Sequence, residues 1–117
     1  MLKDYFATQQ WVEERLGAGK MVVDIAASNI EKGASVTLPY VTGATMALIK
    51  VSYTTAGTSA SYREAHVVLK GLKSSGNTAV PETSIISTVK YSVSASGEIT
   101  LNNGLDYTAY YTVTYYA

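Results

Sequence analysis

The chain has 117 residues and no cysteine, and its nine basic residues balance its nine acidic ones. A domain of this length can bury enough surface to fold alone, and the lack of cysteine excludes disulfides, thiolate metal sites and a cysteine nucleophile. Because zero net charge provides no long-range field for a polyanion, we expect no nucleic-acid binding, and the apolar runs are too short for us to expect a membrane-spanning helix.

Charged residues are unusually sparse, at 15% of the chain against a typical value of about 25%. Lys50 is the only charged residue between Gly33 and Ser61, and the stretch from Tyr91 to Ala117 carries only Glu98 and Asp106. A soluble monomer normally keeps its net charge away from zero. We therefore expect part of this surface to be covered by a partner.

The N-terminal segment predicts the one helix of the chain, over residues 4–16. Asp4 can cap its start and Gly17 can end it. A helix of about twelve residues is marginal alone in water, so it must dock on something. Tyr5, Gln9, Val12 and Leu16 line one face, with Phe6 beside it, while Trp11 points elsewhere. The residues expected to bind a partner through this arm are Tyr5, Phe6, Trp11, Val12 and Leu16.

The segment Gly17–Lys20 predicts a flexible joint between this arm, residues 1–20, and a second unit, residues 21–117. It resembles a phosphate-binding loop only superficially, because Glu14 and Met21 stand where that loop needs glycine and a hydroxyl residue. The first six residues lack the basic region and apolar stretch of a secretion signal, so we expect synthesis in the cytoplasm without export by a signal of its own.

Alternating apolar and polar residues dominate the second unit and predict short strands. The first covers Met21–Ala27 and is followed by a turn at Asn29–Gly33. Four further apolar sets recur with a period of two: Val36, Leu38 and Tyr40; Ile49, Val51 and Tyr53; Ala65, Val67 and Leu69; and Val89, Tyr91, Val93 and Ala95.

Two turns then shape the predicted C-terminal part. Ser96-Gly97 leads into Ile99 and Leu101, and Asn103-Gly104 is the strongest short-range hairpin signal. The sequence therefore predicts a meander from Val89 to Tyr116. Seven or so short strands without helices between them predict a mainly β fold, an antiparallel β-sandwich of jelly-roll-like or Ig-like type or a small barrel, preceded by one short helix.

The residue types that carry catalysis are few and scattered. His66 is the only histidine, and no nucleophile or paired acid shares a motif with it. Glycoside hydrolysis needs two facing carboxylates, and the glutamates lie one or two to an element. We therefore predict no enzyme activity, no catalytic residue, no metal site and no cofactor.

The C-terminal tyrosines divide between two faces of one predicted strand. Tyr107, Tyr111 and Tyr115 share the side of Ala109 and Val113 and are expected in the core. Tyr110 and Tyr116 share the opposite side with threonines. A tyrosine on such a face can fill a subunit interface or stack on a sugar ring, or it can reflect ordinary strand propensity on a solvated surface.

These features together resemble those of small virion proteins of tailed bacteriophages, namely capsid decoration proteins, head fibres and tail-fibre tips. The resemblance rests on residues 1–20 as an anchoring arm and on Ser35–Ala117 as a charge-poor sandwich rich in serine, threonine and tyrosine. It implies a virion location and a homo-oligomer, most often a trimer, bound to a capsid or tail protein. The alternative is a glycan-binding fibre tip with stacking platforms at Tyr40, Tyr62, Tyr110 or Tyr116.

Overall fold

The computed structural model describes residues 21–117, which form a mainly β fold of eight strands and, within this range, no helix. All pairings are antiparallel and build two four-stranded sheets. The helix predicted over residues 4–16, its partner-binding residues and the joint at Gly17–Lys20 lie outside the described residues.

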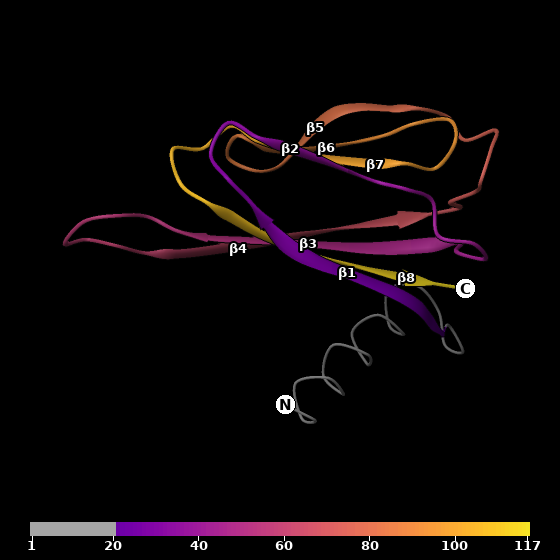
Figure 1. Cartoon of the computed structure of the whole chain (residues 1–117), viewed down its shortest axis with the longest axis horizontal. Coiled ribbons are helices and arrows are strands. Elements are labelled where there is room, and N and C mark those ends of the chain that lie inside the picture. The colour runs from indigo at the N-terminus through magenta and orange to yellow at the C-terminus, as the bar shows by residue number, and fades with distance from the viewer. Residues whose placement is uncertain (1–20) are drawn as a thin grey trace.

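The first sheet, here sheet A, has the order β1-β8-β3-β4, and the second, sheet B, has the order β2-β7-β6-β5. Sheet A consists of β1 (Val22–Ile30), β8 (Ala109–Tyr116), β3 (Met46–Thr54) and β4 (Tyr62–Lys70). Sheet B consists of β2 (Ser35–Leu38), β7 (Ile99–Asn103), β6 (Val89–Val93) and β5 (Val80–Ile86). Figure 1 shows them as two layers, with the β3–β4 hairpin reaching beyond sheet B.

The period-two patterns produce these strands because each sheet buries one side. On β3, Ile49, Val51 and Tyr53 are buried, whereas Thr54 is exposed and Lys50 is partly so. Ile49 and Val51 of sheet A join one apolar cluster with side chains of sheet B. The main contributors from sheet B are Val89, Val93, Ile99 and Leu101. The core therefore lies between the two layers, and the predicted alternation on these strands is confirmed.

The predicted hairpin at Asn103-Gly104 is wrong, and so is the meander from Val89 to Tyr116. Strand β7 pairs with β6 and β2, whereas β8 pairs with β1 and β3 in the other sheet. The chain therefore crosses between the layers after Asn103. The asparagine side chain is buried, donates to the carbonyls of Ile30 and Tyr107, and accepts from the amide of Leu105, which fixes this crossover.

Strand β5 was not predicted. Its alternation is weak, and Pro81 argues against an interior strand because it lacks an amide donor. The structure resolves the conflict by placing β5 at the edge of sheet B, where its register shifts twice against β6. The first strand also runs further than predicted, to Ile30, so that Asn29 lies within β1 and not in a turn.

Candidate functional site

The most informative surface is the outer face of sheet A, the face turned away from sheet B. On β8 it carries Tyr110, Thr112, Thr114 and Tyr116, as predicted, while Tyr111 and Tyr115 point into the core. Register places Ser52 beside Tyr110 and Met46 beside Tyr116. The outer face is therefore polar near Tyr110 and apolar near Tyr116.

A hollow of about 170 Å³ lies on the polar half and is flanked by Tyr62 and Tyr110, both exposed. Tyr62 comes from β4 and Tyr110 from β8, and β3 between them supplies Lys50 and Ser52 to the lining. The Tyr62 hydroxyl donates to Oε2 of Glu64 at 2.9 Å, which orients both side chains. Two aromatic rings beside an ammonium, a hydroxyl and a carboxylate can stack on and hydrogen-bond a sugar.

A second, more open hollow of about 460 Å³ lies on the other side of Tyr110, against Ala27 and Asn29 of β1. The Tyr110 ring therefore stands as a ridge between two shallow depressions. The sequence identified Tyr62 and Tyr110 separately but could not bring them together, because their proximity depends on β3 lying between β4 and β8.

The other two tyrosines named as contact candidates are less accessible. The Tyr40 ring is half-buried and its hydroxyl donates to the carbonyl of Ala44 at 2.7 Å, which is a structural role. Tyr116 is only 1% exposed, so the expectation that it would offer an exposed platform is wrong.

Strand β1 forms an edge of sheet A and carries apolar side chains in solvent. Met21, Val23 and Ile25 are exposed large hydrophobic residues at or just before this strand. Asp24 is its only charged residue, and the pairing with β8 runs without a shift from Ile25 to Ile30. The sequence did not mark this feature, because alternation alone does not tell an edge strand from an interior one.

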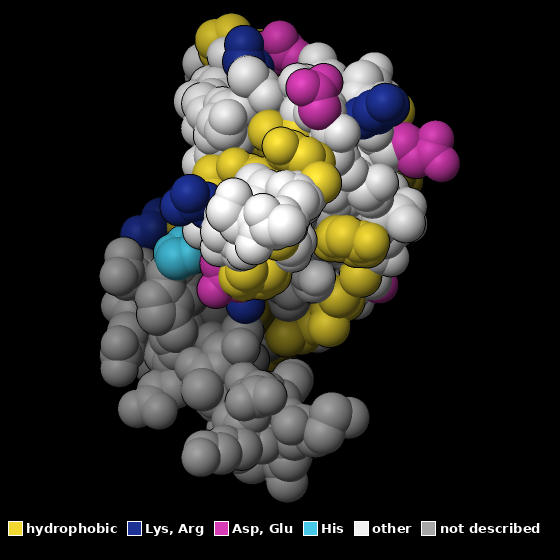
Figure 2. All heavy atoms as spheres, turned by 90° about the vertical axis from the view of Figure 1, so that its left-hand side faces the viewer, with side chains coloured by type: hydrophobic (Ala, Val, Ile, Leu, Met, Phe, Trp, Pro, Cys, Tyr) yellow, Lys and Arg dark blue, Asp and Glu magenta, His cyan; other side chains and the backbone are white. Residues whose placement is uncertain are grey.

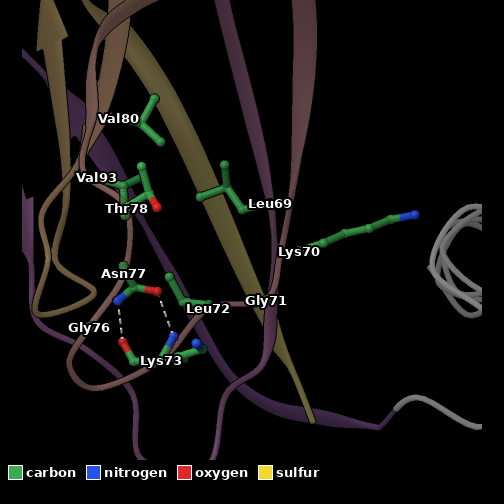
Figure 3. Close-up of a pocket in the computed structure, with 10 residues that line it drawn as sticks. All are labelled: Leu69, Lys70, Gly71, Leu72, Lys73, Gly76, Asn77, Thr78, Val80 and Val93. Carbon is green, nitrogen blue, oxygen red and sulfur yellow. Dashed lines mark hydrogen bonds between the residues drawn. The ribbon is translucent and has the colours of Figure 1, made fainter.

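A further cavity of about 270 Å³ opens where β4 and β5 meet at one side of the two layers (Figure 3). Leu69, Leu72, Val80 and Val93 line its apolar part, while the Lys70 side chain points away from it. Of its polar residues, Asn77 is engaged in hydrogen bonds with the backbone of Lys73. This cavity is a gap in the packing beneath an ordered loop, and it lacks converging polar groups that would orient a ligand.

The acidic and imidazole groups of the described residues do not converge. Three glutamates hydrogen-bond to neutral partners: Glu64 to Tyr62, Glu82 to Asn102, and Glu98 to Ser94 and Ser96. His66 is exposed on β4, opposite Lys50. Within residues 21–117 no three His, Cys, Asp or Glu side chains gather as a metal site would require.

One titratable group in the described part of the chain has a resolved perturbation. Burial raises the pKa of the Tyr115 hydroxyl to about 12, and the nearby Asp24 and Tyr111 act in the same direction. This hydroxyl is buried without a hydrogen-bond partner. It faces the core side of sheet A and belongs to the packing of the fold.

Figure 2 shows the surface at the end of the molecule that carries the β3–β4 hairpin. Dark blue and magenta side chains gather at the top and at the left edge of this view, and white and yellow surface occupies the middle. No helix within residues 21–117 is long and apolar enough to span a membrane.

Comparisons with models of protein families, with curated proteins and with solved structures give no match to this chain.

Proposed function

We propose that the chain is a non-enzymatic structural virion protein of a tailed phage, of the capsid-decoration or head-fibre type. In this role it associates with copies of itself and attaches to a larger capsid or tail assembly. The sparse charge supports a surface that is covered in the mature particle. Edge strand β1 is the single observation that carries the self-association.

The four edge strands differ in how they prevent pairing with another chain. Natural sheets protect edges by short strands, proline, charged residues or bulges. Strand β2 has only four residues, β5 has Pro81, Glu82 and two register shifts, and β4 carries Arg63, Glu64 and Lys70. Strand β1 has one charged residue, Asp24, and one register shift, between Val22 and Asp24, but the six residues from Ile25 to Ile30 have no charge, no proline and no shift. It is therefore the edge suited to pairing.

The fold that we propose for this subunit is a β-sandwich with the jelly-roll count of eight strands in two sheets. Antiparallel pairing of β1 with β1 of a second copy, about a twofold axis, would extend sheet A through main-chain hydrogen bonds. A trimer, which the resemblance to virion proteins implies, needs β1 to meet a different surface of the next copy. Both arrangements use the same strand.

The self-association is tested by light scattering on the purified full chain across a range of concentrations. The wild-type protein should have two or three times the mass of one chain, and Ile25→Lys should shift it to the monomer. Thr83→Lys places the same charge on the protected edge β5 and should leave the oligomer intact. A wild-type protein that stays monomeric at all concentrations would overturn the proposal.

The placement in the virion has its own test. An antibody raised against the chain should label assembled particles of the phage that encodes it. If the particles carry no label while the purified protein remains an oligomer, the virion placement is wrong and the self-association stands.

A glycan-binding fibre tip is a second candidate, favoured by the meeting of Tyr62 and Tyr110 around one polar hollow. Replacement of either residue by alanine should abolish binding on a glycan array, because each ring supplies one of the two stacking surfaces, and loss of Tyr62 also releases Glu64. Tyr40→Phe, which changes only a hydroxyl bonded inside the protein, should not alter binding. An array without hits for the wild-type protein would remove this candidate.

A further inference from the structure

A second apolar cluster lies on the outer face of sheet A, separate from the core. It is centred on Leu48 and Tyr116, and Val22, Met46 and Val68 pack against them. Register places Leu48 beside Val68 on one side and beside Thr114 on the other. The cluster therefore forms an apolar stripe that runs across the strands.

The stripe is buried although it faces away from the core. Tyr110 and Tyr116 lie on the same face of the same strand, yet Tyr110 is 52% exposed and Tyr116 is 1% exposed. Leu48 is only 2% exposed. The apolar side chains among the described residues that pack on this pair, Val22, Met46 and Val68, all belong to sheet A, and none comes from sheet B.

We infer that this stripe is the docking site of residues 1–20 of the same chain. The amide of Met21 donates to the carbonyl of Ala117, and the amide of Ala117 donates to the carbonyl of Met21. The preceding segment therefore joins the sheet directly beside the buried Tyr116. A second copy of the chain would have to reach this site from outside, whereas a four-residue joint holds the cis segment there at high effective concentration.

The sequence of the segment fits the stripe in length and pattern. The helix predicted over residues 4–16 would be about 20 Å long at 1.5 Å per residue. Four strands at about 4.8 Å spacing span about 14 Å between the outermost strand axes. Tyr5, Val12 and Leu16 lie on one predicted face together with the polar Gln9, so this face is mainly apolar and can be set against the stripe.

This docking changes the expected role of the arm in the proposed function. The face with Tyr5, Val12 and Leu16 covers the protein's own sheet. Trp11, which the helical spacing places on another side, is then the part of the arm that remains to contact the larger assembly. That consequence rests on the proposed function, whereas the docking itself does not.

Limited digestion with trypsin tests the docking in the full chain, since Arg15 and Lys20 offer cleavage sites within the segment. Leu48→Glu puts a charge in the stripe and should increase cleavage at these sites by about tenfold or more, as expected for release of a locally stable element. Ser52→Glu, the matched control on the same strand and face but outside the stripe, should leave the rate unchanged. Equal rates in the wild type and Leu48→Glu, with residues 21–117 intact, would overturn the inference.

A cross-linking experiment keeps the inference testable if Leu48→Glu fails to fold. The natural chain has no cysteine, so the pair Val12→Cys and Val68→Cys should form an intrachain disulfide, with Leu16→Cys replacing Val12→Cys in a second double variant to allow for helical register. Trp11→Cys with Val68→Cys should not. A disulfide between chains, or none in either double variant, would contradict docking in cis. Both experiments are also run at dilutions at which light scattering shows the monomer, so that failure of the β1 association is distinguished from failure of the docking.

Discussion

Replacement of Asn103 by alanine should destabilise the fold far more than the same change at its neighbour Asn102. The Asn103 side chain is fully buried at the end of β7. Its amide donates to the carbonyls of Ile30 at 2.9 Å and Tyr107 at 2.8 Å, and its oxygen accepts from the amide of Leu105 at 3.0 Å. These three bonds join β1, β7 and the segment that leads into β8.

The magnitude follows from the number of bonds and from what their loss leaves behind. A hydrogen bond contributes about 1 kcal/mol net, and each buried group left unpaired costs about 1–3 kcal/mol. We therefore expect Asn103→Ala to lower the free energy of unfolding by about 3–5 kcal/mol. Asn102 makes one bond, to Glu82 at 2.8 Å, in a half-exposed position, and its replacement by alanine should cost about 1 kcal/mol or less.

Urea unfolding of both variants, followed by circular dichroism and tyrosine fluorescence, measures these differences. The reasoning is refuted if Asn103→Ala unfolds within about 1 kcal/mol of Asn102→Ala, a margin set by the value of one hydrogen bond. That result would mean that the crossover between the sheets is held by packing and not by the buried amide.

Two further predictions concern the backbone and the buried hydroxyl. Gly97→Ala should cost about 3 kcal/mol or more, because a Cβ there would collide with the carbonyl of Lys73 in addition to the strain of a φ of 79°. Gly57→Ala, at a φ of 98° with open space around it, should lower stability only by the backbone strain of about 1–2 kcal/mol. Thermal melts compare the two variants, and equal losses of stability would contradict the close approach of the Lys73 carbonyl to Gly97. Tyr115→Phe should raise stability at neutral pH by about 1 kcal/mol, since it removes an unpaired buried hydroxyl. Above pH 10 the wild type should lose stability, because the unfolded chain releases the Tyr115 proton while the folded pKa is about 12. The expected loss is about 1.4 kcal/mol by pH 11. Unfolding curves measured across this pH range should show this contribution in the wild type and not in Tyr115→Phe.

The fold was predictable where one side of a strand faces the core. Ile49, Val51 and Tyr53 alternate with polar residues, so β3 and its inward side follow from the sequence alone. The pair Asn103-Gly104 led to the wrong prediction of a hairpin. Its local turn signal is outweighed by the buried hydrogen bonds of Asn103, which no local sequence pattern reveals. Strand β5 escaped prediction because Pro81 is tolerated only at an edge, and edge position is a property of the whole sheet.

The candidate surfaces were predictable only in part, for a related reason. The sequence correctly placed Tyr110 and Tyr116 on one face of β8. It could not predict that one is half-exposed and the other buried, because alternation gives the face of the strand and not the burial at each position along it. The meeting of Tyr62 with Tyr110 and the edge position of β1 likewise depend on strand order.

Hydrogen exchange of the β1 amides in the wild-type oligomer tests the central claim most directly. An unpaired edge leaves alternate amides of Ile25–Ile30 facing solvent, whereas pairing with a partner strand closes them. We predict slow exchange at consecutive amides of this stretch in the wild type, and rapid exchange at every second one in monomeric Ile25→Lys. Alternate rapid exchange in the wild-type protein at concentrations where it is an oligomer would show that the copies associate elsewhere and would contradict the account.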